Sequence, residues 1–412
     1  MARRWLILAD DLTGAADCAI AFAKRGMESV VAWSETVETK AVVLSMNTDS
    51  RRFPAEIAVN RQLEAQGAHW RPGLHLYKKI DSTLRGQPIA ELAAQLAALA
   101  VATGKRAPLA VVAPAFPAMG RVTSGGRVMV GNLPLEETPL WARDHSYGSA
   151  HLPSIMGEAE LATEVIGLDV IRSGAAAVGP RMKDARNRGL AAVVCDCVTE
   201  ADLDVVAAAS LSLAEEVVWV GSGGLAAALA SVESPSISSH PQLPRHSGGV
   251  LVVVGSLAES SRAQARLLVG DGMVEHVVVA PATLFAGCHD PAWSSALDRL
   301  SNGLGGGRDV LLEIALAPHP DLAKGAILAA QLAEMVGQVA PKIGALVATG
   351  GDIACALLSR MGGHGIRLLD EVEPGVPLGL STLCGRSIPV VTKAGAFGDD
   401  ATLRRCLERL KG

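Results

Sequence analysis

The chain has 412 residues, of which 49% are hydrophobic and 19% are charged, and its formal net charge at pH 7 is −5. This composition excludes a disordered chain, and the length exceeds one ordinary hydrophobic core, so two domains are expected. The negative charge without long Lys/Arg runs argues against nucleic acid as a partner, and the lack of a membrane-spanning apolar stretch argues against a membrane protein. Seven scattered cysteines without a C-x-x-C pair are typical of a reducing compartment, so a cytoplasmic location is predicted.

The first part of the chain alternates short apolar runs with helical segments. This rhythm is typical of βαβ units, which predict a parallel sheet covered by helices on both faces. Strands are expected at 5–9, 29–33, 41–46, 74–78, 108–113, 191–195 and 217–220, with helices at 15–25, 55–64 and 90–102. Residues 123–151 are rich in Gly, Pro and acidic residues and are expected to be irregular.

A Ser/Pro/His-rich segment without periodicity interrupts this pattern and is expected to be a linker. After it, strands are expected at 250–254, 277–280, 310–315, 345–348 and 388–392, with helices at 261–268, 322–336, 353–360 and 401–410. The predicted fold class is therefore α/β, with two domains that are each a mostly parallel sheet flanked by helices, and a cleft between them. The predicted boundaries are 1–232 for the N-terminal domain, 233–248 for the linker and 249–412 for the C-terminal domain.

Polar residues gather where the strands of the first domain end. Ligands of open α/β sheets bind beyond the carboxyl ends of the strands, so these corners are the candidate site. Asp10 and Asp11 follow the first strand; one aspartate could be a helix N-cap, but the repulsion within a pair indicates a site that handles charge. Arginines, hydroxyls and acids at neighbouring corners suit a small anionic polyol such as a hydroxy-acid. The residues concerned are Asp10, Asp11, Arg51, Lys79, Asp81, Ser82, Arg85 and Arg121.

Three corners of the second domain have the form strand–Gly–helix. Glycines let backbone N–H groups approach phosphate oxygens, and the helix N-terminus adds a partial positive charge. These corners contain Gly255 and Ser256, then Gly350, Gly351 and Asp352, and finally Gly395. Together they indicate a nucleotide pocket, although no P-loop motif occurs.

The motifs together resemble those of the four-carbon acid sugar kinase family. They occur in collinear order along nearly the whole chain: ADDLTGAAD, NTDSR, KKIDSTLRG, PAFPAMGR and GSGGLA, then VVGSLAESSRAQ, TGGDIA and KAGAFG. The resemblance implies a sugar-acid-binding N-terminal domain and a nucleotide-binding C-terminal domain. It also implies transfer of the ATP γ-phosphate, with Mg²⁺, to the terminal hydroxyl of D-threonate, D-erythronate or a 3-oxo-tetronate.

Carried over by position, the resemblance implies roles for individual residues. Asp81 or Asp10 would take the proton of the terminal hydroxyl, and the choice between them stays open. Substrate contacts are expected from Asp11, Lys79, Ser82 and Arg85, with Arg51 and Arg121 as further arginines that could grip the carboxylate. Contacts to ATP are expected from Ser256, Gly350, Gly351, Asp352, Ile353 and Gly395. Members of the family often have Asn where this chain has Gln87, and Ser and Asn where it has Ala394 and Ala396. A homo-oligomer is left open.

Two other functions remain as alternatives. Gly221-Ser222-Gly223-Gly224-Leu225-Ala226 fits the G-x-G-x-x-A fingerprint, which would suit an NAD-dependent sugar-acid dehydrogenase. However, the ribose-binding acid expected about 20 residues later falls in the Ser/Pro segment. The second alternative is a non-catalytic sugar-acid sensor.

Overall fold

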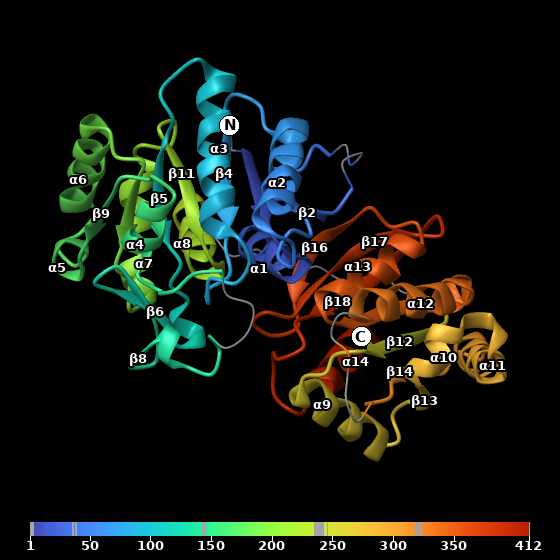
Figure 1. Ribbon diagram of the computed structural model, residues 1–412. Helices are drawn as coiled ribbons and strands as arrows, with labels where there is room; N and C mark the ends of the chain where they lie inside the picture. Colours follow the sequence, from blue (N-terminus) through green and yellow to red (C-terminus); the bar gives the residue numbers. More distant parts are fainter. Residues whose placement is uncertain are drawn as a thin grey trace. The chain divides into compact units, whose positions relative to one another are not determined.

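The computed structural model describes residues 4–34, 37, 39–141, 146–234, 243–244, 246–317, 321 and 324–411, and Figure 1 shows its ribbon. The contacts between residues divide the chain into two compact units. Unit 1 comprises residues 1–31 and 38–238, and unit 2 comprises residues 32–37 and 239–412. Both are built from parallel strands and helices, which confirms the predicted α/β class.

The main sheet of unit 1 is built largely from parallel strands. In spatial order its strands are β2 (Ser29–Ala32), β3 (Val43–Asn47), β1 (Arg4–Ala9), β4 (Leu74–Lys79), β11 (Val217–Gly221), β5 (Leu109–Ala113), β10 (Ala192–Cys195) and β9 (Thr163–Ile166). Every neighbouring pair from β3 to β9 runs parallel. The strands read as continuous apolar runs because both of their faces are covered.

Helices cover this sheet in two groups. Those of unit 1 are α1 (Leu12–Ala23), α2 (Ala55–His69), α3 (Pro88–Thr103), α4 (Leu152–Glu158), α5 (Leu168–Ile171), α6 (Ala175–Arg188), α7 (Glu200–Leu211) and α8 (Gly223–Glu233). Helices α2 and α3 pack side by side, as Figure 1 shows, whereas α1, α8, α7 and α6 pack in a row. No element was expected over residues 152–188, where α4, β9, α5 and α6 form; Pro180 inside α6 weakens the helical pattern there.

The expectation of irregular structure at 123–151 is wrong for much of that segment. Strands β6 (Arg121–Ser124), β7 (Arg127–Val130) and β8 (Leu133–Pro134) form a small antiparallel sheet. Gly125 and Gly126 form the turn between β6 and β7 with φ angles of 60° and 72°, which favour glycine. The Asp196 carboxylate accepts hydrogen bonds from both of these amides, at 2.7 and 2.9 Å, and thereby anchors the turn.

The sheet of unit 2 has a parallel part and an antiparallel part. Its strands are, in spatial order, β13 (Glu275–Val279), β14 (Val310–Ile314), β12 (Gly249–Val254), β15 (Ile343–Thr349), β18 (Arg386–Lys393), β17 (Pro377–Leu383) and β16 (Gly365–Glu371). The pairs from β13 to β18 are parallel. β17 and β16 add antiparallel pairs that were not expected, because two hairpin-connected strands break the βα rhythm.

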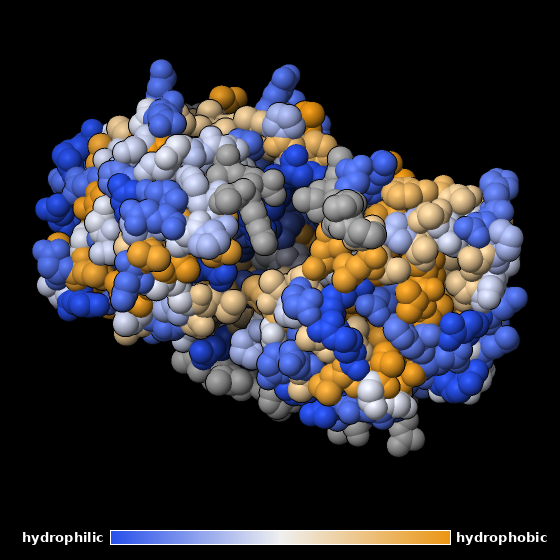
Figure 2. Space-filling view, turned by 60° about the horizontal axis from the view of Figure 1, so that its bottom comes forward, coloured by the Kyte–Doolittle hydropathy of each residue, from blue (hydrophilic) through white to orange (hydrophobic). Residues whose placement is uncertain are grey.

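Helices again lie on the sheet of unit 2. They are α9 (Glu259–Gly270), α10 (Pro281–Ala286), α11 (Pro291–Gly305), α12 (Gly325–Gly337), α13 (Gly351–Arg360) and α14 (Thr402–Lys411). α9 and α14 enclose a hydrophobic core that includes Val252, Val347 and Leu407. On the face drawn in Figure 2, hydrophobic residues form patches that hydrophilic residues separate. Among the described residues, no helix is both long and apolar enough to span a bilayer.

Some expectations fall partly outside the described residues. Of the expected linker, residues 235–242 and 245 are outside them, whereas α8 ends at Glu233 and β12 begins at Gly249. Of the helix expected at 322–336, residues 322 and 323 are outside them, and α12 begins at Gly325. The predicted domain boundaries and the predicted cleft stay predictions.

In each sheet the chain first adds strands on one side of its first strand and then crosses to the other side. After β1 the chain adds β2 and β3 on one side and then crosses to β4 on the other side of β1. After β12 it adds β13 and β14 on one side and then crosses to β15 on the other. Ligands of open parallel sheets bind beyond the carboxyl ends of the strands at such a switch point. The topology therefore marks two places for chemistry, one in each unit.

Candidate functional site

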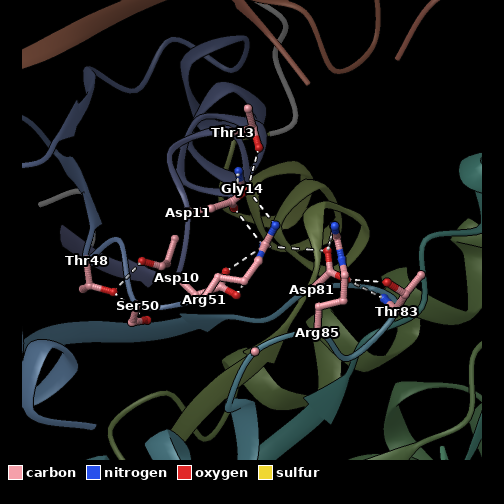
Figure 3. Close-up of polar contacts among 12 residues, drawn as sticks. Asp10, Asp11, Thr13, Gly14, Thr48, Ser50, Arg51, Asp81, Thr83 and Arg85 are labelled. Atoms are coloured by element: carbon pink, nitrogen blue, oxygen red, sulfur yellow. Dashed lines mark hydrogen bonds and ion pairs between the residues drawn. The ribbon is translucent and has the colours of Figure 1, made fainter. Parts of the chain in front are cut away.

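The switch point of unit 1 brings together residues from three strand ends. β3, β1 and β4 are neighbours and run parallel, so their carboxyl ends lie at one edge of the sheet. Asp10 and Asp11 follow β1, Arg51 lies in the loop after β3, and Asp81 and Arg85 follow β4. Figure 3 shows these side chains pointing toward one another.

Arg51 is the centre of this cluster. Its Nε and Nη2 donate to the two oxygens of Asp10, at 2.7 and 2.8 Å, and its Nη1 and Nη2 donate to the two oxygens of Asp11, at 2.7 and 2.9 Å. Its Nη2 also lies 3.7 Å from the Oδ1 atom of Asp81. Burial opposes the guanidinium charge, but Asp10 and Asp11 raise the pKa of Arg51 well above its usual value. Arg51 thus neutralises the repulsion between the adjacent aspartates.

Asp11 is also the N-cap of α1. Its Oδ1 accepts a hydrogen bond from the Gly14 amide at 2.9 Å, and its Oδ2 accepts one from the Thr13 hydroxyl at 2.7 Å. The helix consequently begins at Leu12, earlier than expected, and the Thr-Gly pair lies in its first turn. The capping interpretation is therefore right for Asp11 without excluding a site role, because the same carboxylate binds Arg51.

Gly14 makes room for a buried lysine. A Cβ atom there would lie 2.5 Å from Oδ1 of Asp11 and 2.6 Å from Nζ of Lys79. Lys79 is only 4% exposed. Burial would lower the pKa of Lys79, but attraction to Asp11 and Asp10 raises it, so the ammonium remains charged. Any larger residue at position 14 would displace one of these charges.

Asp81 and Arg85 form the second half of the cluster. Nε and Nη2 of Arg85 donate to the two oxygens of Asp81, both at 2.9 Å, and the hydroxyl of Thr83 also donates to Asp81. Burial would raise the pKa of Asp81, but Arg51 and Arg85 hold it well below its usual range. Leu84 is buried with a φ of 58°, a strained conformation for leucine that lets the chain turn back within this loop.

Arg121 is a further arginine near this pair. It is the first residue of β6, and its charge interacts with those of Asp81 and Arg85. Its Nε is buried and has no hydrogen-bond partner among the described residues. Burial lowers the pKa of Arg121, so the guanidinium would gain from an anion. Ser82 is half-buried, and within the described ranges no contact engages its hydroxyl.

The cluster has a net positive charge and a polar support behind it. Arg51, Lys79, Arg85 and Arg121 accompany the carboxylates of Asp10, Asp11 and Asp81. The successive lysines of β4 point to opposite faces of the strand, so Lys78 instead binds Glu91 of α3 at 2.6 Å in a fully buried pair. Glu91 also accepts a hydrogen bond from Ser50 at 2.8 Å, directly beside Arg51. Thr83, Lys78 and Glu91 were not among the predicted site residues; the doublet of lysines that ends an apolar strand was the available signal.

The second switch point gathers the glycine corners of unit 2. β12, β15 and β18 are neighbours, so the loops that follow them lie at one edge. A Cβ atom on Gly395 would lie 2.1 Å from the Oγ atom of Ser256, so these two expected residues are in close contact. Gly350, at the N-cap of α13, has a φ of 91° and open space where a Cβ atom would lie. Backbone groups at these positions fit a phosphate-binding surface.

The remaining expected residues of this corner lie in the first turn of α13. Gly351 begins the helix, Asp352 is exposed, and Ile353 is half-buried. The Cδ1 atom of Ile353 fills the space where a Cβ atom on Gly255 would lie, at 2.2 Å. Among the described residues, no group of three or more His, Cys, Asp or Glu side chains is placed to hold a metal ion.

The GSGGLA corner, by contrast, is used for packing. Residues 221–224 are buried. A Cβ atom on Gly221 would lie 2.7 Å from the carbonyl oxygen of Ala113, and one on Gly224 would lie 2.6 Å from that of Ala115. An oxygen of the Asp17 carboxylate lies only 2.3 Å from the position that a Cβ atom on Gly223 would take. A carboxylate at the N-terminus of α8 occupies the position that a pyrophosphate would need, which disfavours the dehydrogenase alternative.

We predict that replacing Arg51 with Met destabilises the fold by about 3–5 kcal/mol at pH 7, because the buried Asp10 and the half-buried Asp11 would both lose the guanidinium that they share. Although burial opposes it, the charge of Arg51 lowers the pKa of Asp11 in the folded protein below its ordinary value of 3.8. The ion pair therefore stabilises the fold fully above pH 3.8, and this stabilisation is lost as the pH falls through the lower, folded-state pKa. The difference between wild type and Arg51→Met should therefore shrink below about pH 4. Urea unfolding at pH 7, 5 and 3 measures it.

The matched control is Arg52→Met. Arg52 pairs with Asp49 at 3.0 Å, but both side chains are more than a third exposed, so its loss should cost no more than about 1 kcal/mol. Equal costs for the two variants, or a cost for Arg51→Met that is independent of pH, would contradict the central role of Arg51.

Known proteins resemble this chain over nearly its whole length. The family model described as the sugar-binding N-terminal domain matches residues 5–229, and the one described as the nucleotide-binding C-terminal domain matches residues 251–403. A D-threonate kinase of Cupriavidus necator is 41% identical, over 97% of this chain and 96% of that protein. A D-erythronate kinase of Heliobacterium modesticaldum is 29% identical, over 98% of this chain and 96% of that protein.

A solved structure shares the fold. The crystal structure of a Haemophilus influenzae protein matches with a TM-score of 0.76 at 20% sequence identity, covering 98% of this chain and 99% of that one. Since both family models match in the order of the two units, and the relative from Cupriavidus necator is similar from end to end, the chain belongs to the four-carbon acid sugar kinase family.

Proposed function

We propose that the protein is an ATP-dependent kinase that phosphorylates the terminal hydroxyl of a four-carbon sugar acid, with D-threonate as the preferred substrate. The observation that carries the proposal is the cluster of Arg51, Lys79, Arg85 and Arg121 around three aspartates at the switch point of unit 1. Its net positive charge suits a carboxylate, and its oxygens suit hydroxyl groups. The choice of D-threonate is supported by the 41% identity to the D-threonate kinase, against 29% to the D-erythronate kinase.

Arg121 and Arg85 are the proposed receptors of the substrate carboxylate. Arg51 uses all three of its nitrogens on Asp10 and Asp11, so it acts as a scaffold rather than as a carboxylate grip. Arg85 uses only Nε and Nη2 on Asp81, and its side chain is 41% exposed, which leaves Nη1 for a ligand. The buried Nε of Arg121 is a further donor. Ser82 and Asp11 would contact the secondary hydroxyls.

Phosphoryl transfer depends mainly on positioning and charge stabilisation rather than on covalent chemistry. Asp81 or Asp10 would orient the terminal hydroxyl and take its proton. Asp81 accepts hydrogen bonds from Arg85 and Thr83, and Asp10 accepts two from the Nε–Nη2 edge of Arg51. Both carboxylates are thus fixed in direction, as an acceptor of a substrate proton must be.

The nucleotide would bind at the switch point of unit 2. Ser256 and Gly395 lie in contact, and the open space at Gly350 admits a ligand beside the N-terminus of α13. Gly351, Asp352 and Ile353 in its first turn would complete this surface, with contacts to phosphate made largely by backbone amides. Mg²⁺ bound with ATP would neutralise phosphate charge.

The direct test is a coupled ADP assay with Mg-ATP and a panel of D-threonate, D-erythronate and a 3-oxo-tetronate. ADP release should depend on the acid, with the highest kcat/KM for D-threonate. A nicotinamide titration in the same samples should show no redox change. Binding of an acid without ADP release would favour the sensor, and acid-dependent nicotinamide reduction would favour the dehydrogenase; either result would overturn the proposal.

The Arg121→Met variant tests the carboxylate receptor. Loss of a charged hydrogen bond of about 1.5–3 kcal/mol should raise the KM for the acid roughly 10- to 100-fold while leaving the KM for ATP unchanged. Arg127→Met is the control, since Arg127 lies on the adjacent strand β7 and pairs with Glu136 instead. A parallel rise of both KM values would indicate a folding defect and sink the assignment.

Separate Asn substitutions distinguish the two candidate bases. Asn keeps the shape of each carboxylate but accepts a proton poorly, so the variant of the true base should lose about 10²–10⁴-fold in kcat. The other variant should change KM for the acid more than kcat, because it loses only an orienting contact. If Asp81→Asn and Asp10→Asn both retain kcat within tenfold, neither residue is the base.

A further inference from the structure

Lys393 is a buried lysine without an ion-pair partner in the described part of the chain. It is the last residue of β18, has no exposed surface, and is among the largest fully buried side chains. Its Nζ donates to the carbonyl oxygens of Ala394, Gly395 and Phe397, at 3.0, 3.2 and 2.9 Å, and to the hydroxyl of Ser261 at 3.2 Å. The ammonium therefore lies inside the loop that follows β18, where neutral oxygens surround it.

These contacts fix the direction of the peptide groups in the loop. The Gly395 carbonyl also accepts hydrogen bonds from the hydroxyls of Ser260 and Ser261, at 3.0 and 2.6 Å, so three donors hold it. The chain has no cis peptide bond among the described residues, and in a trans peptide the C=O and the following N–H point in opposite directions. Carbonyls drawn toward Lys393 thus turn the following amides away from it.

The amides turned outward are those of Gly395, Ala396 and Gly398. None of them has a hydrogen-bond partner within the described ranges, and Ala396 and Gly398 are exposed. The same loop contacts Ser256 through Gly395, and the amide of Gly350 donates to the Lys393 carbonyl at 2.8 Å. The end of β18 and the loop that follows it consequently contact both of the other glycine corners of unit 2.

We propose that Lys393 is a positioning residue for a polyphosphate: its ammonium draws the loop carbonyls inward, and this orients the amides of Gly395 and Ala396 toward the phosphates. The proposal rests on nucleotide binding by unit 2. Lys393 itself does not touch the ligand, because its Nζ lies behind the carbonyl layer. A buried positive charge behind these amides also adds a favourable field for an anion in front of them.

The surroundings of Lys393 make the effect sensitive to pH. Burial lowers the pKa of Lys393 to about 8, so the ammonium loses its charge as the pH rises through this value. Among the described residues, two other titratable groups face it, Glu373 and Cys406. Glu373 is bound by Thr402 and Arg405, and burial raises the pKa of the Cys406 thiol to about 12. Lys393 is accordingly the group in this set that titrates near pH 8.

The test measures ADP and ATP binding by calorimetry for wild type, Lys393→Met, Lys393→Arg and Lys393→Ala. Lys393→Met should weaken nucleotide binding at least tenfold, whereas D-threonate binding stays unchanged. Wild-type affinity for nucleotide should fall between pH 7 and 9.5, and the fall should be absent in Lys393→Met. Lys393→Arg keeps its charge over this range, so any nucleotide binding that it retains should not fall with pH. Added methylammonium should partly restore binding to Lys393→Ala.

Lys342→Met is the matched control, because Lys342 is an exposed lysine of the same unit. Unchanged nucleotide affinity in a folded Lys393→Met variant would overturn the proposal. If Lys393→Met does not fold, a wild-type affinity that is constant from pH 7 to 9.5 would overturn it instead. Failure of wild type to bind nucleotide at all would reject the proposed function, which separates the two outcomes.

Discussion

The contact between Arg51 and the adjacent pair Asp10 and Asp11 is the constraint on which the site of unit 1 depends. Two neighbouring carboxylates at the end of a buried strand are tolerated only with a countercharge in contact with both. Arg51 supplies this countercharge from the loop after β3. Main-chain hydrogen bonds support the contact, because the amides of Ser50 and Arg51 donate to the Asp10 carbonyl at 3.0 and 3.2 Å. The loops after β1 and β3 are thereby joined, and Asp81 after β4 lies within 3.7 Å of the same guanidinium.

Both units hold a strand-exit loop in place with a buried cation, but the acceptors differ. In unit 1, Lys79 and Arg51 face carboxylates, which keeps their charges and fixes the carboxylate oxygens for hydroxyl groups. In unit 2, Lys393 is buried among backbone carbonyls; burial lowers its pKa, and the carbonyls drawn toward it turn the following amide N–H groups outward. The first arrangement presents oxygens and arginines, as a sugar acid requires. The second presents N–H groups, as a phosphate requires.

Glycines in these loops allow charged or polar side chains to approach the backbone closely. Gly14 leaves room for the Asp11 carboxylate and the Lys79 ammonium, and Gly395 leaves room for the Ser256 hydroxyl. The glycines of the GSGGLA corner instead leave room for the carbonyl oxygens of Ala113 and Ala115 and for the carboxylate of Asp17 in α1. Similar sequence patterns thus leave space beside the backbone in one place and serve packing in another. The deciding factor is what already occupies the space beside the glycine.

The sequence alone determined the α/β class, most of the parallel strands and the residues that gather at the first switch point. Apolar runs of strand length and polar residues at their ends are local signals, and parallel strands must end at the same edge. Only the tertiary structure decided which charges pair. It paired Arg51 with the aspartates and placed Lys78 and Lys79 on opposite faces of β4. It also left Nε of Arg121 without a hydrogen-bond partner among the described residues and enclosed Lys393 within its own loop. Pairing depends on strand order, side-chain direction and burial, which bring together residues far apart in the chain, and no local pattern encodes those three together.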